Sequence, residues 1–225
     1  MPNTSKKPRS RTVITPSGGI VRGKFPSKKN GRMIHHEGLL ELEACYLFEM
    51  SPRVMAYNEQ PQKISYVANN RIAKYFPDFE LQLDTGETVL VEIKHSTILA
   101  RAEIEEKYSQ INAHMQRTYQ SFSILTEASI RQEPRLCNLR LAYRELLPQA
   151  PTHTWLDSLL PHLAALQSPS IHEVNVMLKP YGVCAFDLLA SGHLTCDLTR
   201  PLASSTRVSL NYGGDHDWIR ISEAL

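Results

Sequence analysis

The hydrophobic pattern predicts one helix followed by a series of short strands in the first half of the chain. Over residues 34–50 apolar side chains recur at helical spacing, and Ser51-Pro52 ends the pattern because the residue before a proline disfavours helical geometry. Later segments alternate apolar and polar residues or are rich in β-branched and aromatic residues, which predicts strands. These segments are 54–58, 64–67, 72–75, 78–83 and 88–94.

A long amphipathic segment over 99–120 predicts a second helix, and 122–126 predicts a further strand. The order of helix, antiparallel strands, helix and strand is typical of an α/β fold built on one mixed sheet. We therefore expect an α/β or α+β sandwich in which helices flank one mixed sheet.

Near residue 130 the chain becomes leucine-rich and helical. Helices are predicted over 138–147, 155–166, about 170–178 and 184–190, and the third begins with the spacing of a capping box at Ser170 and Glu173. Strands are predicted over 194–197 and 206–210, so this half has the outline of a winged helix. The expected domains are a flexible basic arm (1–30), a domain built on the mixed sheet (31–128) and a winged-helix-like domain (129–225).

Composition predicts an ordinary globular protein in a reducing compartment. No apolar run approaches the roughly 20 residues that span a bilayer, and the basic N-terminus lacks the apolar region of a signal peptide. We therefore expect a cytoplasmic protein without a membrane partner. The four cysteines form no C-x-x-C pair, so reduced thiols are favoured over a zinc site at Cys184, His193 and Cys196.

Positive charge is concentrated at the N-terminal end. Residues 1–36 carry nine Lys or Arg and no acid, and since the whole chain is +2, the remainder is −7 (2 − 9). A block of one sign favours a nucleic-acid contact, with a solubilising tail as the alternative. The residues expected to bind nucleic acid are Lys24, Lys28, Lys29 and Arg32 from this block, together with Gln60, whose alternative role is to stabilise a turn.

Two carboxylates and a lysine are expected to converge at the centre of the first half. Glu92 and Lys94 alternate along one predicted strand and therefore share a face, and Asp78 begins the strand before it. Acidic oxygens hold Mg²⁺, which can polarise a phosphodiester, and a lysine can neutralise charge on the phosphoryl oxygens. The alternative is that these charges form only the solvated face of a hairpin.

The preceding helix offers a third carboxylate. Glu37 and Glu41 lie one turn apart on one flank, whereas Glu43 points away from Glu41. The residues alone leave open whether Glu37 or Glu41 completes the site.

In this set of motifs the chain resembles the PD-(D/E)xK nuclease superfamily, and more closely the TnsA endonucleases of Tns-type transposons. The motifs run in family order across roughly residues 20–126, and the resemblance implies a restriction-endonuclease-like sheet flanked by helices and an endonuclease domain over residues 31–128. These motifs are Lys24-Phe-Pro-Ser27, Glu37-x-x-x-Glu41, Ser51-Pro-Arg-Val54, Glu59-Gln60-Pro61, Tyr75-x-Pro77-Asp78, Val91-Glu92-Ile93-Lys94, Lys107-Tyr108 and Phe122-Ser-Ile-Leu-Thr126.

The resemblance implies that Glu41, Asp78, Glu92 and Lys94 are catalytic, with Mg²⁺, or Mn²⁺ in its place, held by the three acids. Where many relatives have Ser, this chain has Glu37, and Glu41 is favoured because its distance to Val54 fits the family better. The implied activity, in a bacterial cytoplasm, is cleavage of the 5′ strands at transposon ends beside a TnsB-like transposase.

The resemblance also implies that the C-terminal half binds a TnsC-like ATPase, which agrees with the absence of Lys and Arg from residues 183–193. The alternatives are a free-standing restriction or repair nuclease and a non-catalytic DNA-binding regulator.

Overall fold

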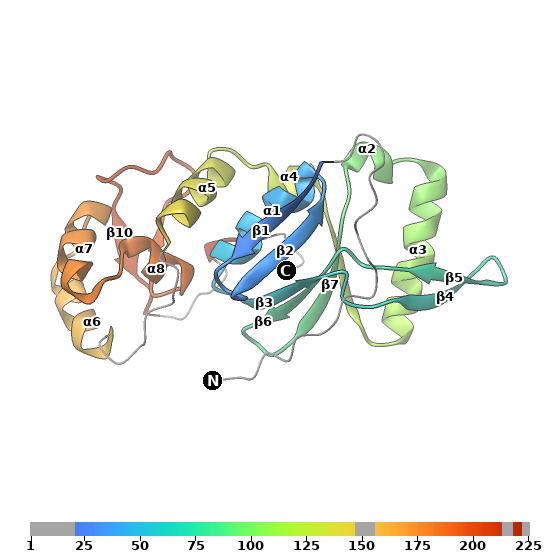
Figure 1. The fold of residues 1–225 in the computed structure, drawn as a ribbon, viewed down its shortest axis with the longest axis horizontal. Helices are drawn as coiled ribbons and strands as arrows, with labels where there is room; N and C mark the ends of the chain where they lie inside the picture. Colours follow the sequence, from blue (N-terminus) through green and yellow to red (C-terminus); the bar gives the residue numbers. More distant parts are fainter. Residues whose placement is uncertain (1–20, 147–155, 213–217, 222–225) are drawn as a thin grey trace.

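The computed structural model describes residues 21–146, 156–212 and 218–221. Most of the predicted arm (residues 1–20) lies outside these ranges. Figure 1 shows an elongated molecule with a sheet at its centre, a helical lobe at one end, and a hairpin beside a long helix at the other. No helix in the described part of the chain has the length and apolar character needed to span a bilayer.

The central sheet has four strands in the order β3-β6-β7-β8. The first three are antiparallel neighbours and β8 runs parallel to β7, so the predicted mixed sheet is confirmed. In β7 every residue after Thr88 is buried, as expected for a strand covered on both faces. The bounds are β3 (Val54–Glu59), β6 (Phe79–Leu83), β7 (Thr88–Ile93) and β8 (Ser121–Leu125).

Helices cover both faces of this sheet. On one face α1 (Leu39–Met50) contributes Phe48, whose ring lies 5.4 Å from Phe79 and 5.6 Å from Tyr57. On the other, α3 (Ala102–Arg117) follows the short α2 (Ser96–Leu99) and belongs to a separate apolar cluster that includes Leu90. This arrangement fits a restriction-endonuclease-like fold.

A hairpin precedes α1, and the prediction of helix from residue 34 is wrong there. β1 (Arg22–Ser27) pairs with β2 (Arg32–Glu37), and the helix begins only at Leu39. In β2 the buried residues are Ile34 and His36, which is the two-residue period of a strand, and Gly38 (φ 143°) separates strand from helix. β1 also begins inside the segment predicted to be a flexible arm.

A second hairpin, β4 (Ile64–Ala68) and β5 (Arg71–Tyr75), projects beside α3 (Figure 1). Its turn is Asn69-Asn70, with φ angles of 49° and 59°, the left-handed conformation that asparagine tolerates. The two predicted strands are confirmed.

The C-terminal half contains mainly short helices and one small antiparallel sheet. The predicted capping box is present, because Ser170 and Glu173 exchange hydrogen bonds at the start of α7. The winged-helix arrangement stays a prediction. The bounds are α4 (Glu127–Ile130), α5 (Arg135–Glu145), α6 (Leu156–Ala165), α7 (Ile171–Leu178), η2 (Lys179–Tyr181), α8 (Ala185–Ala190), β9 (Leu194–Cys196) and β10 (Val208–Leu210).

The two halves share one apolar core. A single cluster of buried side chains runs from Phe25 to Ile221 and includes residues of α1, α5 and α8. The carboxylate of Glu43 in α1 adds a polar link, since it pairs with Arg131 at 2.6 Å and Arg140 at 2.7 Å. Residue 128 therefore does not mark a break in the packing.

Replacing Phe79 by alanine is expected to lower the free energy of unfolding by about 3–5 kcal/mol, because it leaves a cavity between α1 and the sheet. Gln82, exposed on the same strand, is the matched control, and its alanine variant should differ little from the wild type. Urea unfolding measures both; equal effects would contradict the assigned core.

Candidate active site

Asp78 lies at the entrance to β6, where backbone contacts fix it. Its Oδ2 accepts a hydrogen bond from the amide of Ile93 at 2.8 Å, which ties the carboxylate to β7. Its carbonyl accepts a hydrogen bond from the amide of Gln60 at 2.8 Å, at the end of β3. Three strands therefore determine the position of this one acid.

Glu92 is buried in the middle of the sheet, with 4% of its surface exposed. Its two oxygens accept hydrogen bonds from two tyrosines, Tyr75 at the end of β5 and Tyr108 in α3. Lys94, two residues further along the chain, places its Nζ 3.0 Å from Oε1 of Glu92. The predicted sharing of one face by Glu92 and Lys94 is thus present, and the buried charge is paired and hydrogen-bonded.

Sequence reasoning did not identify the tyrosines as partners of Glu92. Tyr75 is 17 residues before Glu92 and Tyr108 is 16 after it, on separate elements, so spacing gives no signal. Both rings also carry the ammonium of Lys107 near their faces, at 5.9 Å and 5.0 Å from the centroids.

Glu41 and Glu37 occupy different environments. Glu37 is the last residue of β2 and faces Arg22 across the hairpin, with Arg22 Nε 3.7 Å from Glu37 Oε1. Glu41 lies in the first turn of α1, and its Oε2 accepts a hydrogen bond from the amide of Glu37 at 2.8 Å. Glu43 is buried on another side of the helix against Arg131.

Two of the carboxyl groups, Glu41 and Asp78, have a raised pKa. Burial raises the pKa of Glu41 to about 7, and the charges of Glu37 and Glu92 add to the rise. The pKa of Asp78 is also raised, first by burial and then by Glu92 and Glu41. These couplings place Glu41, Asp78 and Glu92 in one electrostatic neighbourhood.

Lys94 is the cation of this neighbourhood. Burial alone would lower the pKa of Lys94, but Glu92, Asp78 and Glu41 raise it, so the side chain remains an ammonium. One ammonium faces three acids, so the raised pKa values of Glu41 and Asp78 mean that these carboxyl groups ionise fully only when further positive charge is present.

This donor set suits Mg²⁺ in chemistry, although the described residues contain no ready-made group of three or more metal-binding side chains. Mg²⁺ in proteins commonly takes one or two carboxylate oxygens and completes its shell with water and substrate phosphate. Among the described residues, Asp78 Oδ1 and Glu41 Oε1 accept no hydrogen bond, so one oxygen of each acid remains for such a ligand role.

Most of the cations expected to bind nucleic acid make contacts within the protein. Lys29 donates to the carbonyls of Phe48 and Ser51, and desolvation lowers its pKa to about 8. Lys28 donates to the carbonyls of Tyr143 and Leu146.

Arg32 pairs with Glu59 at 2.7 Å, whereas Lys24 is exposed on β1. Gln60, in a left-handed turn (φ 43°), contacts the site through its backbone N–H, which donates a hydrogen bond to the carbonyl of Asp78. That these five residues bind nucleic acid stays a prediction.

Part of the sequence matches a known protein family. Residues 51–127 match a family described as the TnsA-like endonuclease N terminal domain. The matched segment contains Asp78, Glu92 and Lys94, and Glu41 precedes it. No curated protein matches the chain.

In metal-free protein, Glu41→Gln is expected to raise the free energy of unfolding at pH 8. The pKa of Glu41 is higher in the folded state, about 7 against 4.5, so the folded protein gains stability from protonation. That gain is present at low pH and is lost as the pH rises from about 4.5 through about 7, a difference of at most about 3 kcal/mol. Glutamine stays neutral throughout.

Urea unfolding in EDTA at pH 5 and pH 8 tests this prediction. The free energy of unfolding of the variant should exceed that of the wild type only at pH 8. Glu103→Gln, exposed at the start of α3, is the control and should show no such pH-dependent gain. A variant less stable than the wild type at pH 8 would contradict the assigned environment.

Proposed function

Because residues 51–127 form a TnsA-like endonuclease N-terminal domain, we propose that the whole protein is a Mg²⁺-dependent DNA endonuclease. Its action is to cut the 5′, non-transferred, strands at transposon ends, together with a TnsB-like transposase. The observation that carries the proposal is the Glu92–Lys94 pair at 3.0 Å beside Asp78, with Glu41 coupled to all three.

Each acidic or basic residue of the site has its own role in the proposed phosphodiester hydrolysis. Bound Mg²⁺, for which Mn²⁺ can substitute, would polarise the scissile phosphate and lower the pKa of water. Asp78 and Glu41 offer their remaining oxygens to hold it, and Glu92, fixed by two tyrosines, keeps the ammonium of Lys94 in place. Lys94 then faces the phosphoryl oxygens, where it neutralises developing charge.

Between the two candidate helix acids, the contacts support Glu41. Glu37 is directed to Arg22, whereas the pKa of Glu41 responds to Lys94 and Glu92. The excess of carboxylates also argues against a purely DNA-binding regulator, since uncompensated acids would repel phosphate.

Asp78→Asn and Lys94→Ala are each expected to reduce strand cleavage at least about 100-fold, because each removes a charged group that acts on the reacting phosphate. The assay uses the full chain with its transposase, DNA carrying the transposon ends, and Mg²⁺; mapping the cut strand identifies the 5′ strands. Asp84→Asn, in an exposed turn, is the control and should cleave normally.

A folded Asp78→Asn protein that cuts DNA at the wild-type rate would contradict the active-site assignment. Efficient cutting of naked DNA by the wild-type chain alone would instead favour a free-standing restriction or repair nuclease.

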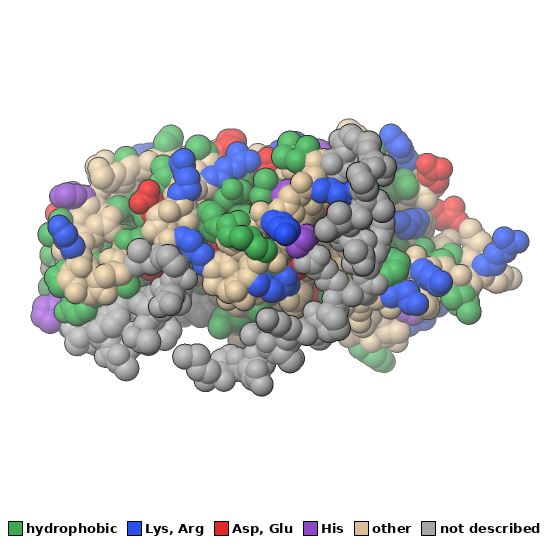
Figure 2. All heavy atoms as spheres, viewed as in Figure 1, with side chains coloured by type: hydrophobic (Ala, Val, Ile, Leu, Met, Phe, Trp, Pro, Cys, Tyr) green, Lys and Arg blue, Asp and Glu red, His purple; other side chains and the backbone are tan. Residues whose placement is uncertain are grey.

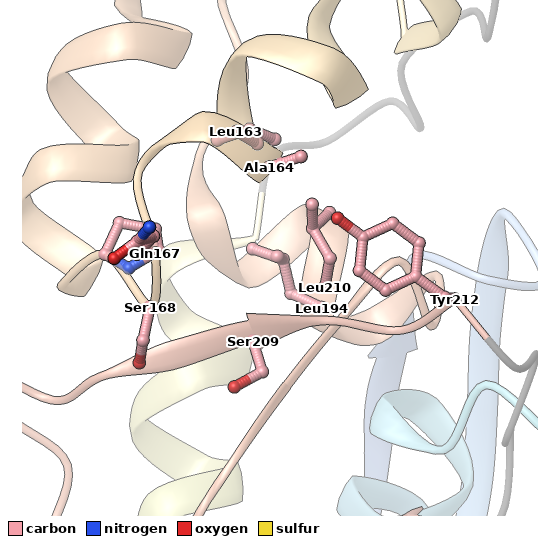
Figure 3. Close-up of a pocket in the computed structure, with 9 residues that line it drawn as sticks. Leu163, Ala164, Gln167, Ser168, Leu194, Ser209, Leu210 and Tyr212 are labelled. Carbon is pink, nitrogen blue, oxygen red and sulfur yellow. The ribbon is translucent and has the colours of Figure 1, made fainter.

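We also propose that the C-terminal half binds a TnsC-like ATPase. A cavity of about 220 Å³ lies between the end of α6 and the β9–β10 sheet. Figure 3 shows Leu194, Leu210 and Tyr212 on the strand side of this cavity, with Leu163 and Ala164 on the helix side. Tyr212 is 82% exposed at its rim, a position from which an aromatic ring can enter a protein interface.

Charge in this half supports a protein partner over DNA. α8 contains no Lys or Arg. Of the two arginines near the small sheet, Arg207 lies 3.1 Å from Glu173 and Arg200 lies 3.8 Å from Asp197, so both face carboxylates of their own chain.

Tyr212→Glu is expected to weaken association of the full-length protein with the ATPase at least about 10-fold, because it places a charge at an apolar rim. Tyr119→Glu is the matched control, since Tyr119 is 98% exposed on the nuclease half, and it should bind normally. Titration of labelled protein with the ATPase gives both affinities. Equal affinity for wild type and Tyr212→Glu would move the interface elsewhere.

A further inference from the structure

The β4–β5 hairpin is a positively charged segment without a single acid. Between Gln60 and Pro77 the sequence contains Lys63, Arg71 and Lys74 and no Asp or Glu. All three side chains are exposed, and none forms an ion pair with a residue that the structure describes. This differs from Lys28, Lys29 and Arg32, which make contacts inside the protein.

One face of the hairpin is fixed to the nuclease half. Its buried residues Ile64, Tyr66 and Tyr75 belong to the same apolar cluster as Tyr108 and Met115 of α3. Packing along the whole hairpin means that its conformation is set before any partner arrives, which lowers the entropy lost on binding.

The turn is held as well. The side-chain amide of Gln110 in α3 donates to Oδ1 of Asn69 at 3.3 Å. Both ends of the hairpin are therefore anchored, one through Tyr75 at Glu92 and the other through Asn69.

The opposite face is open to solvent and carries two β-branched side chains. Val67 and Ile72 are directly opposed in the strand register and are 59% and 79% exposed. Ser65 and Lys74 form the next exposed pair along the hairpin. Lys74 lies on the same face as this apolar pair, whereas Arg71, next to Ile72 at the turn, projects from the other face. The two cations therefore flank the apolar pair, and such a surface suits a partner that is anionic and also offers apolar contact.

We propose that this hairpin is a DNA-binding ribbon that grips the duplex beside the cut. Lys63, Arg71 and Lys74 contact phosphates, while Val67 and Ile72 enter a groove, whose major form accommodates a two-stranded ribbon and presents thymine methyl groups. The inference rests on the proposed nuclease function and adds which surface holds the substrate.

Figure 2 shows Lys and Arg side chains over the end of the molecule where the hairpin projects in Figure 1, with acidic side chains beside them.

The geometry also sets the reach of the ribbon. β5 leads through Phe76 and Pro77 directly into Asp78, so the hairpin starts at the active site. A five-residue strand rises roughly 16 Å, which corresponds to about five base pairs of duplex. The ribbon should therefore contact DNA on one side of the scissile phosphate only.

The charge test compares two double variants of the full chain, Arg71→Gln with Lys74→Gln, and Arg144→Gln with Lys179→Gln as a control in the C-terminal half. Both control residues are exposed cations. Affinity for a labelled duplex is measured across a salt series in EDTA, so that cleavage does not interfere. The ribbon variant should bind at least about 10-fold more weakly, with a salt-dependence slope smaller by about 2, and the control should match the wild type.

The groove contact has its own test in Val67→Thr with Ile72→Thr, which keeps β-branched side chains. This variant should bind DNA several-fold more weakly with an unchanged slope. Hydroxyl-radical footprinting with the Arg71 and Lys74 variant should show loss of protection on one side of the cut.

The proposal is wrong if the salt-dependence slope of the Arg71 and Lys74 variant is unchanged, or if the control variant loses as much affinity for DNA. Normal DNA binding combined with lost association to the transposase or the ATPase also overturns it and assigns the surface to a protein. These outcomes are separate from failure of the nuclease proposal, in which the wild type fails to cut although the ribbon-dependent binding is intact.

Discussion

The structure depends on holding a buried carboxylate, Glu92, in the middle of a sheet. A charge at that depth is unfavourable unless it is paired and hydrogen-bonded, and here one ammonium and two phenols meet the requirement. The partners come from β5, β7 and α3, so these elements must assemble around it. The same requirement explains why a strand otherwise made of apolar residues ends in an acid and a lysine.

The strands that form the site were predictable because their two-residue period is strong and their turns have distinctive chemistry. Asp78, Glu92 and Lys94 followed from that pattern. The β1–β2 hairpin did not, because His35, His36 and Glu37 are polar residues on a short strand, and the apolar run after them fits a helix equally well. Only Gly38, at a φ of 143°, marks the boundary between the strand and the helix, and a single glycine in a sequence is compatible with several kinds of local structure.

The distribution of charge along the sequence was the least reliable guide to where a side chain lies in the fold. The sequence shows how many cations the N-terminal block has, but not that Lys29 points inward at helix carbonyls while Lys63 stays outside. The inward Lys29 donates to buried carbonyls at the C-terminal end of α1, where a helix leaves carbonyl groups without intrahelical partners. Such contacts depend on tertiary packing, to which local sequence gives no access.

The link between Glu43 and the two arginines of the C-terminal half makes α1 a shared component. One flank of this helix carries Glu41 and another accepts Arg131 and Arg140. Exchange of C-terminal halves between related proteins, as in the construction of chimeras with new partner preferences, must therefore keep these arginines matched to the recipient helix. A graft joined at residue 128 without them would leave the buried carboxylate of Glu43 without its partners, on the helix that also bears Glu41, so the natural unit of exchange includes α1.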